Sequence, residues 1–184
     1  IPITDELPLM LEFMMNTFLR PSDVKELRHR NVAIIRNNQT YLRIQTDTSK
    51  TVKTPVVSLE PAVHIYEQLT KFNQSQGKSC NPEDFLFFPN LKNRTYAMET
   101  MRRQFDAITV DAKLKKTESG ESRTLYSLRH TAIMFRLTKG DQIDLLTLAR
   151  NCRTSVQMID KFYAKPLSAE MNVALIQSDR KSTN

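Results

Sequence analysis

Apolar residues recur at helical spacing along much of the chain. Leu7, Leu11, Met14 and Phe18 lie three or four positions apart and predict a buried first helix, with Pro8 in or near its first turn. Further helices are predicted by Val24 and Leu27 after Pro21, by Ala62, Ile65, Leu69 and Phe72 after Pro61, by Met98, Met101, Phe105 and Ile108, and by Leu128, Thr131, Phe135 and Leu137. The pattern therefore indicates a mostly helical chain.

Three segments between the second and third predicted helices have strand composition. They cover residues 32–36, 41–45 and roughly 52–58, and Asn37-Asn38 forms the first turn between them. We predict a small three-stranded antiparallel sheet. The fold class expected from the sequence is α+β, mostly helical, with this one sheet.

Polar residues and a glycine set the expected helix ends in the C-terminal half. Ser127 is predicted to cap the helix that begins there, Gly140 to end it, and Asp141 to cap the next one.

The last strongly predicted helix is short. It begins at Ser155, turns Val156, Ile159 and Phe162 inward, and carries Tyr163 at its C-terminal end.

Length and chain ends suggest the domain organisation. A chain of 184 residues suits one domain, 1–184, with a core over about 1–166 and a C-terminal segment over 167–184 whose part 168–177 is amphipathic. Because the chain begins at Ile1, without an initiator methionine, we expect it to be a piece of a longer protein.

Charge and cysteine content limit which binding partners and which cellular compartment we expect. Twenty-seven Lys and Arg against 20 Asp and Glu give a net charge of +7, which favours an acidic partner such as nucleic acid or an anionic membrane surface. The two cysteines, Cys80 and Cys152, form no disulfide framework and fit a reducing, cytosolic setting. No apolar run is long enough to cross a bilayer, so a membrane partner is not expected.

Four separated motifs carry candidate chemistry. Residues 19–23 read Leu-Arg-Pro-Ser-Asp, and residues 48–53 form a polar turn with two lysines that leads to Ser58-Leu59. Residues 126–131 read Tyr-Ser-Leu-Arg-His-Thr, and residues 153–163 read Arg-Thr-Ser-Val-Gln-Met-Ile-Asp-Lys-Phe-Tyr.

In their order and spacing these motifs resemble the boxes of the tyrosine recombinase, or phage integrase, catalytic domain. The resemblance implies that Arg20 and Arg129 are the two catalytic arginines and Tyr163 is the nucleophile. Counting back eight residues from Ser58-Leu59 selects Lys50 as the catalytic lysine, with Lys53 as the fallback.

The sequence departs from the family at two site positions. Tyr126 stands where the family usually has His, and Thr154 replaces the usual His or Trp nine residues before the nucleophile. A packing or capping role and a catalytic role are both open for these two residues. We interpret His130 as a buried, hydrogen-bonded neighbour of the site rather than a catalyst.

The chemistry that the resemblance implies fits these residue types. Two permanently charged Arg forks can bind the oxygens of a phosphodiester as charge gathers on them, and a Lys can protonate the leaving 5′ oxygen. Tyr163 would form a 3′-phosphotyrosyl link that a DNA 5′ hydroxyl later attacks. Because bond energy is kept in that link, neither a cofactor nor a metal is expected.

The resemblance also implies partners and surroundings. We expect site-specific recombination, such as integration or excision of a mobile element, at double-stranded DNA attachment sites by a self-associated tetramer. A further N-terminal DNA-binding domain and docking of the C-terminal segment on a neighbouring protomer are implied as well, in the cytoplasm of a prokaryotic or phage-infected cell. The basic residues that could together follow DNA phosphates are Arg28, Arg30, Arg102, Arg103, Lys115 and Lys116.

Two alternatives stay open at the level of sequence. A DNA-binding module with the same fold and impaired catalysis would explain the neutral hydroxyls of Tyr126 and Thr154. A type IB topoisomerase-like enzyme would use the same arginine clamp and tyrosine nucleophile.

Overall fold

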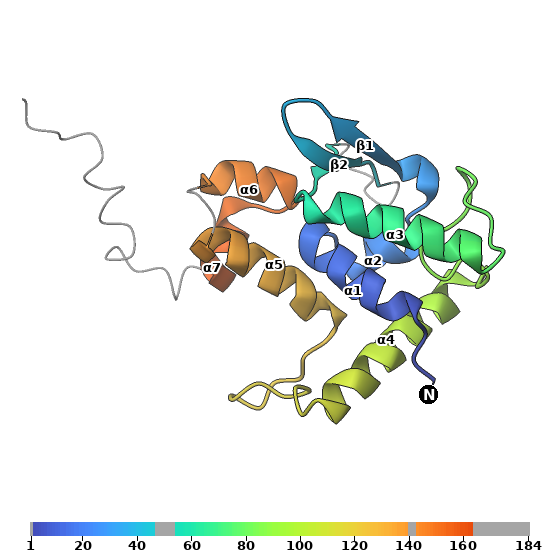
Figure 1. The fold of residues 1–184 in the computed structure, drawn as a ribbon. Helices are drawn as coiled ribbons and strands as arrows, with labels where there is room; N and C mark the ends of the chain where they lie inside the picture. Colours follow the sequence, from blue (N-terminus) through green and yellow to red (C-terminus); the bar gives the residue numbers. More distant parts are fainter. Residues whose placement is uncertain (1, 47–53, 140–142, 164–184) are drawn as a thin grey trace, which may run out of the picture.

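The structure is a computed structural model that describes residues 2–46, 54–139 and 143–163 (Figure 1). The α-helices of these residues are α1 (Glu6–Thr17), α2 (Pro21–Glu26), α3 (Pro61–Ser75), α4 (Arg94–Asp111), α5 (Leu125–Lys139), α6 (Leu145–Asn151) and α7 (Val156–Tyr163), and one 3-10 turn spans His29–Asn31. Predictions about Lys50, Lys53, Gly140, Asp141 and residues 168–177 fall outside the described residues. In the described ranges, no helix combines the length and the apolar character that a membrane span requires.

The predicted three-stranded antiparallel sheet is confirmed, in the order β1-β2-β3. Strand β1 (Val32–Arg36) pairs with β2 (Thr40–Ile44), and β2 pairs with the short β3 (Val56–Val57). Alternation along β2 buries Leu42 and Ile44 and exposes Arg43 between them, as expected for a sheet with one face on the core.

The main core lies where the helices of the N-terminal half meet the sheet. Helix α3 packs against β2 on one side and α1 on the other, while α2 packs against α4 (Figure 1). Fully buried residues of this cluster include Met10, Phe13, Leu42, Leu69 and Phe87. The spacing of apolar residues that predicted α1, α3 and α4 reflects this shared core.

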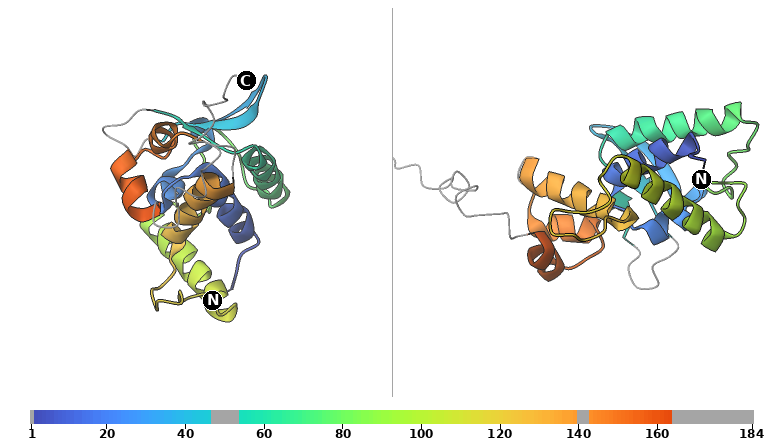
Figure 2. Two further views of the ribbon diagram at one scale, coloured as in Figure 1. Left: turned by 90° about the vertical axis from the view of Figure 1, so that its left-hand side faces the viewer. Right: turned by 90° about the horizontal axis from the view of Figure 1, so that it is seen from below.

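A second, smaller core joins the C-terminal helices. It contains Phe18 from the end of α1, Ile133 from α5, Leu148 from α6, and Ile159 and Tyr163 from α7. Figure 2 shows these last three helices gathered at one end of the molecule. The residue predicted to be the nucleophile therefore belongs to a hydrophobic cluster.

Helix α7 begins after Ser155 as predicted, whereas α5 and α6 begin at other residues than predicted. Helix α5 begins at Leu125, so Ser127 lies inside its first turn, where its hydroxyl accepts a hydrogen bond from the Thr124 amide at 3.0 Å. Helix α6 begins after Asp144, whose carboxylate accepts from the Thr147 amide at 2.8 Å. Ser and Asp suit a cap at several nearby positions, so residue type alone did not distinguish between them.

The predicted inward face of α7 was partly wrong. Ile159 is buried, but the Phe162 side chain is 53% exposed and Tyr163 is only 6% exposed. Tyr163 lies four residues after Ile159 and so stays on its face of the helix, whereas Phe162 is turned away from the second core.

Candidate active site

Arg20 is placed by the junction of α1 and α2. It is the N-cap residue of α2, and its backbone amide donates to the Asp23 carboxylate at 3.0 Å. Its side chain is half-buried and donates from Nη2 to the carbonyl oxygen of Arg153 at 3.0 Å. The motif at residues 19–23 and the beginning of the motif at residues 153–163 are therefore in direct contact.

Arg129 projects from α5 and is 2% exposed. Its guanidinium donates to the carbonyl oxygen of Phe18 and, at 2.5 Å, to the carbonyl oxygen of Cys152. Phe18 has a left-handed backbone (φ 58°) at the end of α1, which turns its carbonyl oxygen out of the helix. A planar fork with five N–H donors suits this double contact and keeps further donors for a ligand.

Three arginines lie close together at residues 151–153, where α6 ends and the motif 153–163 begins. Arg20 and Arg129 contact carbonyl oxygens of this 151–153 segment, and Arg153 belongs to it. Burial raises the pKa of the Cys152 thiol to about 11, and the positive charges of Arg129, Arg153 and Arg20 oppose that shift. Such a concentration of fixed positive charge favours binding of an anion such as a phosphate.

Arg153 adds a third positive charge to the site, and the sequence motifs did not identify it as a site residue. Its backbone is left-handed (φ 52°), its side chain donates to the Asp23 carboxylate at 2.5 Å and to the Thr46 hydroxyl, and its buried Nε has no hydrogen-bond partner among the described residues. Burial lowers the pKa of Arg153, and the Asp23 charge opposes this. No signal in the sequence pointed to this pair, because the burial of Asp23 is set by the fold.

This ion pair leads to a stability prediction. The two side chains are each 4% exposed, so Asp23→Asn, which keeps the shape and an acceptor oxygen but removes the charge, is expected to lower the free energy of unfolding by about 3–5 kcal/mol. Urea unfolding followed by circular dichroism measures this loss. The matched control is Glu99→Gln, which removes the surface partner of Arg102 and Arg103 and should cause a much smaller loss. Equal losses in the two variants would contradict the prediction.

Tyr163 reaches a cavity of about 180 Å³ between α5 and α7. Tyr126, Arg129 and Thr154 line the same cavity, together with His130 and apolar residues of both helices. Four of the residues predicted from the sequence are thus brought together, although they come from motifs that are distant along the chain.

The electrostatics of the described site hold Tyr163 in its neutral form. Burial raises the pKa of Tyr163 to about 12, and the nearby Arg129 opposes the shift. Its hydroxyl lies 2.5 Å from Nδ1 of His130. Burial, and then the charge of Arg129, lower the pKa of that histidine.

The two departures from the family pattern have distinct surroundings. Tyr126 is 39% exposed and its ring packs edge-on against His130, with the centroids 5.1 Å apart. Thr154 is half-buried on the cavity wall, and its amide donates to the carbonyl oxygen of Ala149 at 2.9 Å. Ser155 caps α7, because its hydroxyl accepts from the Met158 amide at 3.2 Å, so Thr154 is not needed for that role.

Residues 47–53, which include Lys50 and Lys53, lie outside the described residues, but described residues on either side of them contact the 151–153 segment. Before them, Thr46 accepts from Arg153. After them, Val57 donates to Asn151 Oδ1 at 2.8 Å, and Asn151 Nδ2 donates to the Val57 carbonyl oxygen at 3.0 Å.

Most of the basic residues expected to follow DNA already have partners within the described chain. Arg28 packs on the ring of Phe85, with 3.9 Å between guanidinium carbon and ring centroid, and Lys115 contacts Asp106 at 2.7 Å. The remaining ion pairs are Arg30 with Glu83, and Arg102 and Arg103 with Glu99. Exposed pairs of this kind are weak, so phosphates can still compete for these arginines.

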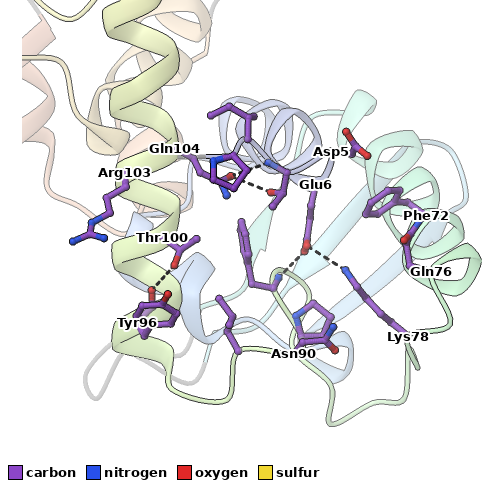
Figure 3. A pocket seen from close by; sticks show the side chains of 16 residues that line it. Asp5, Glu6, Phe72, Gln76, Lys78, Asn90, Tyr96, Thr100, Arg103 and Gln104 are labelled. Carbon is purple, nitrogen blue, oxygen red and sulfur yellow. Dashed lines mark hydrogen bonds and ion pairs between the residues drawn. The ribbon is translucent and has the colours of Figure 1, made fainter.

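A larger cavity, of about 590 Å³, shares no residue with this site. It lies where the chain enters α1, between the end of α3 and the face of α4 (Figure 3). Glu6 at its wall accepts from the Phe88 amide at 2.6 Å and faces Lys78 at 3.5 Å, while the Thr4 hydroxyl donates to Gln104 at 3.0 Å (Figure 3). These polar groups are paired with one another, and their contacts hold the beginning of α1 against Lys78, Phe88 and Gln104.

Solved structures that resemble this chain show its fold, whereas the comparisons of its sequence found no match. No protein-family model matches the chain, and no curated protein is similar to it in sequence. The crystal structure of XerA recombinase superimposes on 98% of this chain and 66% of its own, with a TM-score of 0.59 and 15% identity. That of XerH site-specific recombinase, bound to its palindromic difH substrate in a post-cleavage complex, covers 98% of this chain and 49% of its own, with a TM-score of 0.64 and 17% identity.

These likenesses identify the class of fold. The chain has the fold of the tyrosine recombinase catalytic domain, as its motifs predicted, with a helical body and one small three-stranded sheet. It spans about two thirds of the XerA chain and half of the XerH chain.

Proposed function

We propose that the chain is the catalytic domain of a site-specific DNA recombinase that cleaves and rejoins strands through a 3′-phosphotyrosyl link to Tyr163. The observation that carries the proposal is the shared cavity, in which the hydroxyl-bearing Tyr163 and the buried cation Arg129 meet. The fold supports it, since one structural neighbour is a recombinase held on its DNA substrate after cleavage.

The proposed chemistry uses fixed positive charge and a positioned hydroxyl. Arg20 and Arg129 would bind the non-bridging oxygens of the scissile phosphate while Tyr163 attacks phosphorus and the 5′ oxygen leaves. Each arginine is held by a carbonyl oxygen of the 151–153 segment, so their positions are linked to the helix that carries the nucleophile. The reaction needs neither a metal nor a nucleotide cofactor.

The proposal extends to the partners implied by the motifs. These are double-stranded attachment sites, self-association into a tetramer on DNA, and a role in integration or excision of a mobile element. A further N-terminal DNA-binding domain belongs to the same proposal, and it would supply much of the target recognition.

A covalent-trapping experiment tests the function. The chain is incubated with end-labelled, nicked duplexes whose central segment is randomised, so that the short strand released by cleavage diffuses away and the adduct accumulates. A labelled band that survives a denaturing gel is the expected result, and sequencing of its DNA gives the target. Absence of an adduct with every duplex that the chain binds would refute the proposal.

A second candidate is a DNA-binding module with impaired catalysis. It is favoured by the neutral hydroxyls of Tyr126 and Thr154 in the cavity and by burial, which raises the pKa of Tyr163 to about 12 and disfavours the phenolate. This candidate predicts duplex binding without an adduct, so the same gel separates the two. Relaxation of supercoiled DNA without exchange between duplexes would indicate a topoisomerase-like enzyme instead.

Lys50 is proposed as the acid that protonates the leaving 5′ oxygen. Lys50 lies four positions after Thr46, which contacts Arg153, so chain length keeps the two Cα atoms within about 14 Å of each other. A lysine between Thr46 and Val57, which both contact the 151–153 segment, can reach a phosphate held there.

Sulfur substitution tests this role. Lys50→Ala should slow cleavage of ordinary DNA by about 10²–10⁴-fold, yet cleave a 5′-phosphorothiolate duplex nearly as fast as the unchanged protein, because the sulfur leaves without a proton. Lys53→Ala is the matched control and should show neither defect nor rescue. Rescue of Lys53→Ala alone would transfer the role to Lys53, and rescue of neither would place the acid outside this turn.

A further inference from the structure

His130 is held against the proposed nucleophile from several sides. Its Nδ1 lies 2.5 Å from the Tyr163 hydroxyl oxygen, and their ring centroids are 5.4 Å apart. Tyr126, one turn earlier on α5, packs edge-on against the same ring, and Phe162 of α7 lies 6.2 Å from it. The imidazole is therefore confined, with one nitrogen directed at the atom that would attack phosphorus.

The protonation states set the direction of this hydrogen bond. Burial raises the pKa of Tyr163 to about 12, so the phenol keeps its proton at neutral pH. Burial, followed by the charge of Arg129, lowers the pKa of His130, so the imidazole is neutral. The phenol O–H then donates to an unprotonated Nδ1, which is the arrangement that a proton transfer requires.

We propose that His130 is the general base that takes the proton of Tyr163 as its oxygen attacks phosphorus. This inference rests on the function proposed above. As the Oη–P bond forms and the P–O5′ bond breaks, the phenolic proton moves to Nδ1 and a proton from the acid, proposed as Lys50, goes to the leaving oxygen. In rejoining, the 5′ hydroxyl attacks phosphorus and gives its proton back to that acid, the P–Oη bond breaks, and the imidazolium returns its proton to Tyr163.

The charges around His130 couple this transfer to bound DNA. Arg129 on the same helix disfavours a second positive charge. Among the described residues, the other titratable side chains that face the pair are those of Tyr126 and Cys152, and burial raises the pKa of the Cys152 thiol to about 11. A phosphodiester in the cavity would neutralise Arg129 and favour the imidazolium. Without DNA the base stays unprotonated and the phenol stays neutral, which protects the nucleophile from unproductive reaction.

A substitution that keeps the hydrogen bond but cannot accept a proton distinguishes a base from a positioning residue. The probe is the duplex recovered by covalent trapping, and the readout is the single-turnover rate of adduct formation. His130→Ala and His130→Asn should both react about 10²–10⁴-fold more slowly than the unchanged protein, and added imidazole should partly restore His130→Ala. His64→Asn, at an exposed histidine of α3, is the matched control and should react at the unchanged rate.

The pH profile gives a second, independent readout. The unchanged protein should react faster as His130 loses its proton, with unit slope at acid pH and a plateau above, and His130→Asn should lose this acidic limb. A full rate in His130→Asn would overturn the proposal, and so would the absence of an acidic limb in the unchanged protein, a result that needs no folded variant. Failure of the recombinase function itself would appear differently, as no adduct in the unchanged protein at any pH.

Discussion

Tyr163→Phe is expected to abolish the covalent protein–DNA adduct completely. The change removes only the hydroxyl oxygen that would bond to phosphorus, so no slower route to the same adduct remains. The ring stays in the second core, beside Ile133 and Ile159, and the fold should survive. Loss of the hydrogen bond to His130 should cost about 1–3 kcal/mol of stability, because the histidine nitrogen loses its donor.

The measurement is a denaturing gel with the trapped duplex, paired with fluorescence anisotropy for DNA affinity. Affinity should change little, since the phosphate-binding arginines are untouched. Tyr96→Phe, at an exposed tyrosine of α4, is the matched control and should form the adduct normally. Persistence of the adduct in Tyr163→Phe would remove this residue as the nucleophile.

Arg129→Lys is expected to lower the single-turnover cleavage rate by about 10²–10³-fold while keeping the positive charge. An ammonium cannot contact the carbonyl oxygens of Phe18 and Cys152 and a phosphate together in the geometry of a planar fork. The same loss of contacts should reduce stability, because Arg129 joins the end of α1 to the segment before α7.

Two comparisons separate catalysis from stability in this variant. Arg20→Lys changes a half-buried arginine with one such carbonyl contact, so it should slow cleavage with a smaller loss of stability. Arg102→Lys, exposed on α4, should change neither quantity. Cleavage at the unchanged rate in folded Arg129→Lys would leave Arg129 as a structural residue that ties helices together.

Much of the fold could be predicted because helices and strands leave local signals. The periods of 3.6 and 2 residues placed α1, α3 and α4 and the three strands, and Pro21 and Pro61 marked two helix starts. Exact caps were less predictable. Ser127 and Asp141 were equally suitable by residue type, yet the described helices begin near Thr124 and Asp144.

The site could be predicted only in part. Motif order selected Arg20, Tyr126, Arg129, Thr154 and Tyr163 as candidates, and the last four line one cavity. The catalytic roles of these residues, and that of Lys50, remain predictions for the experiments above.

The partners of two site residues could not be predicted from the sequence. Arg153 pairs with Asp23 across 130 residues. His130 was predicted to be a hydrogen-bonded neighbour of the site, and the structure shows that its partner is the Tyr163 hydroxyl, 33 residues away. Neither residue type nor local spacing predicts such a pair, since each partner alone is ordinary.

The sequence by itself determined the elements, the class of fold and the candidate chemistry, because these depend on neighbours within a few positions and on the order of motifs along the chain. Only the tertiary structure decided which face of α7 is buried, which raises the pKa of Tyr163 and exposes Phe162. It also decided which charges converge on the 151–153 segment. The physical reason is that burial and electrostatic interaction depend on distance in space, which packing of the helices sets and separation along the chain does not.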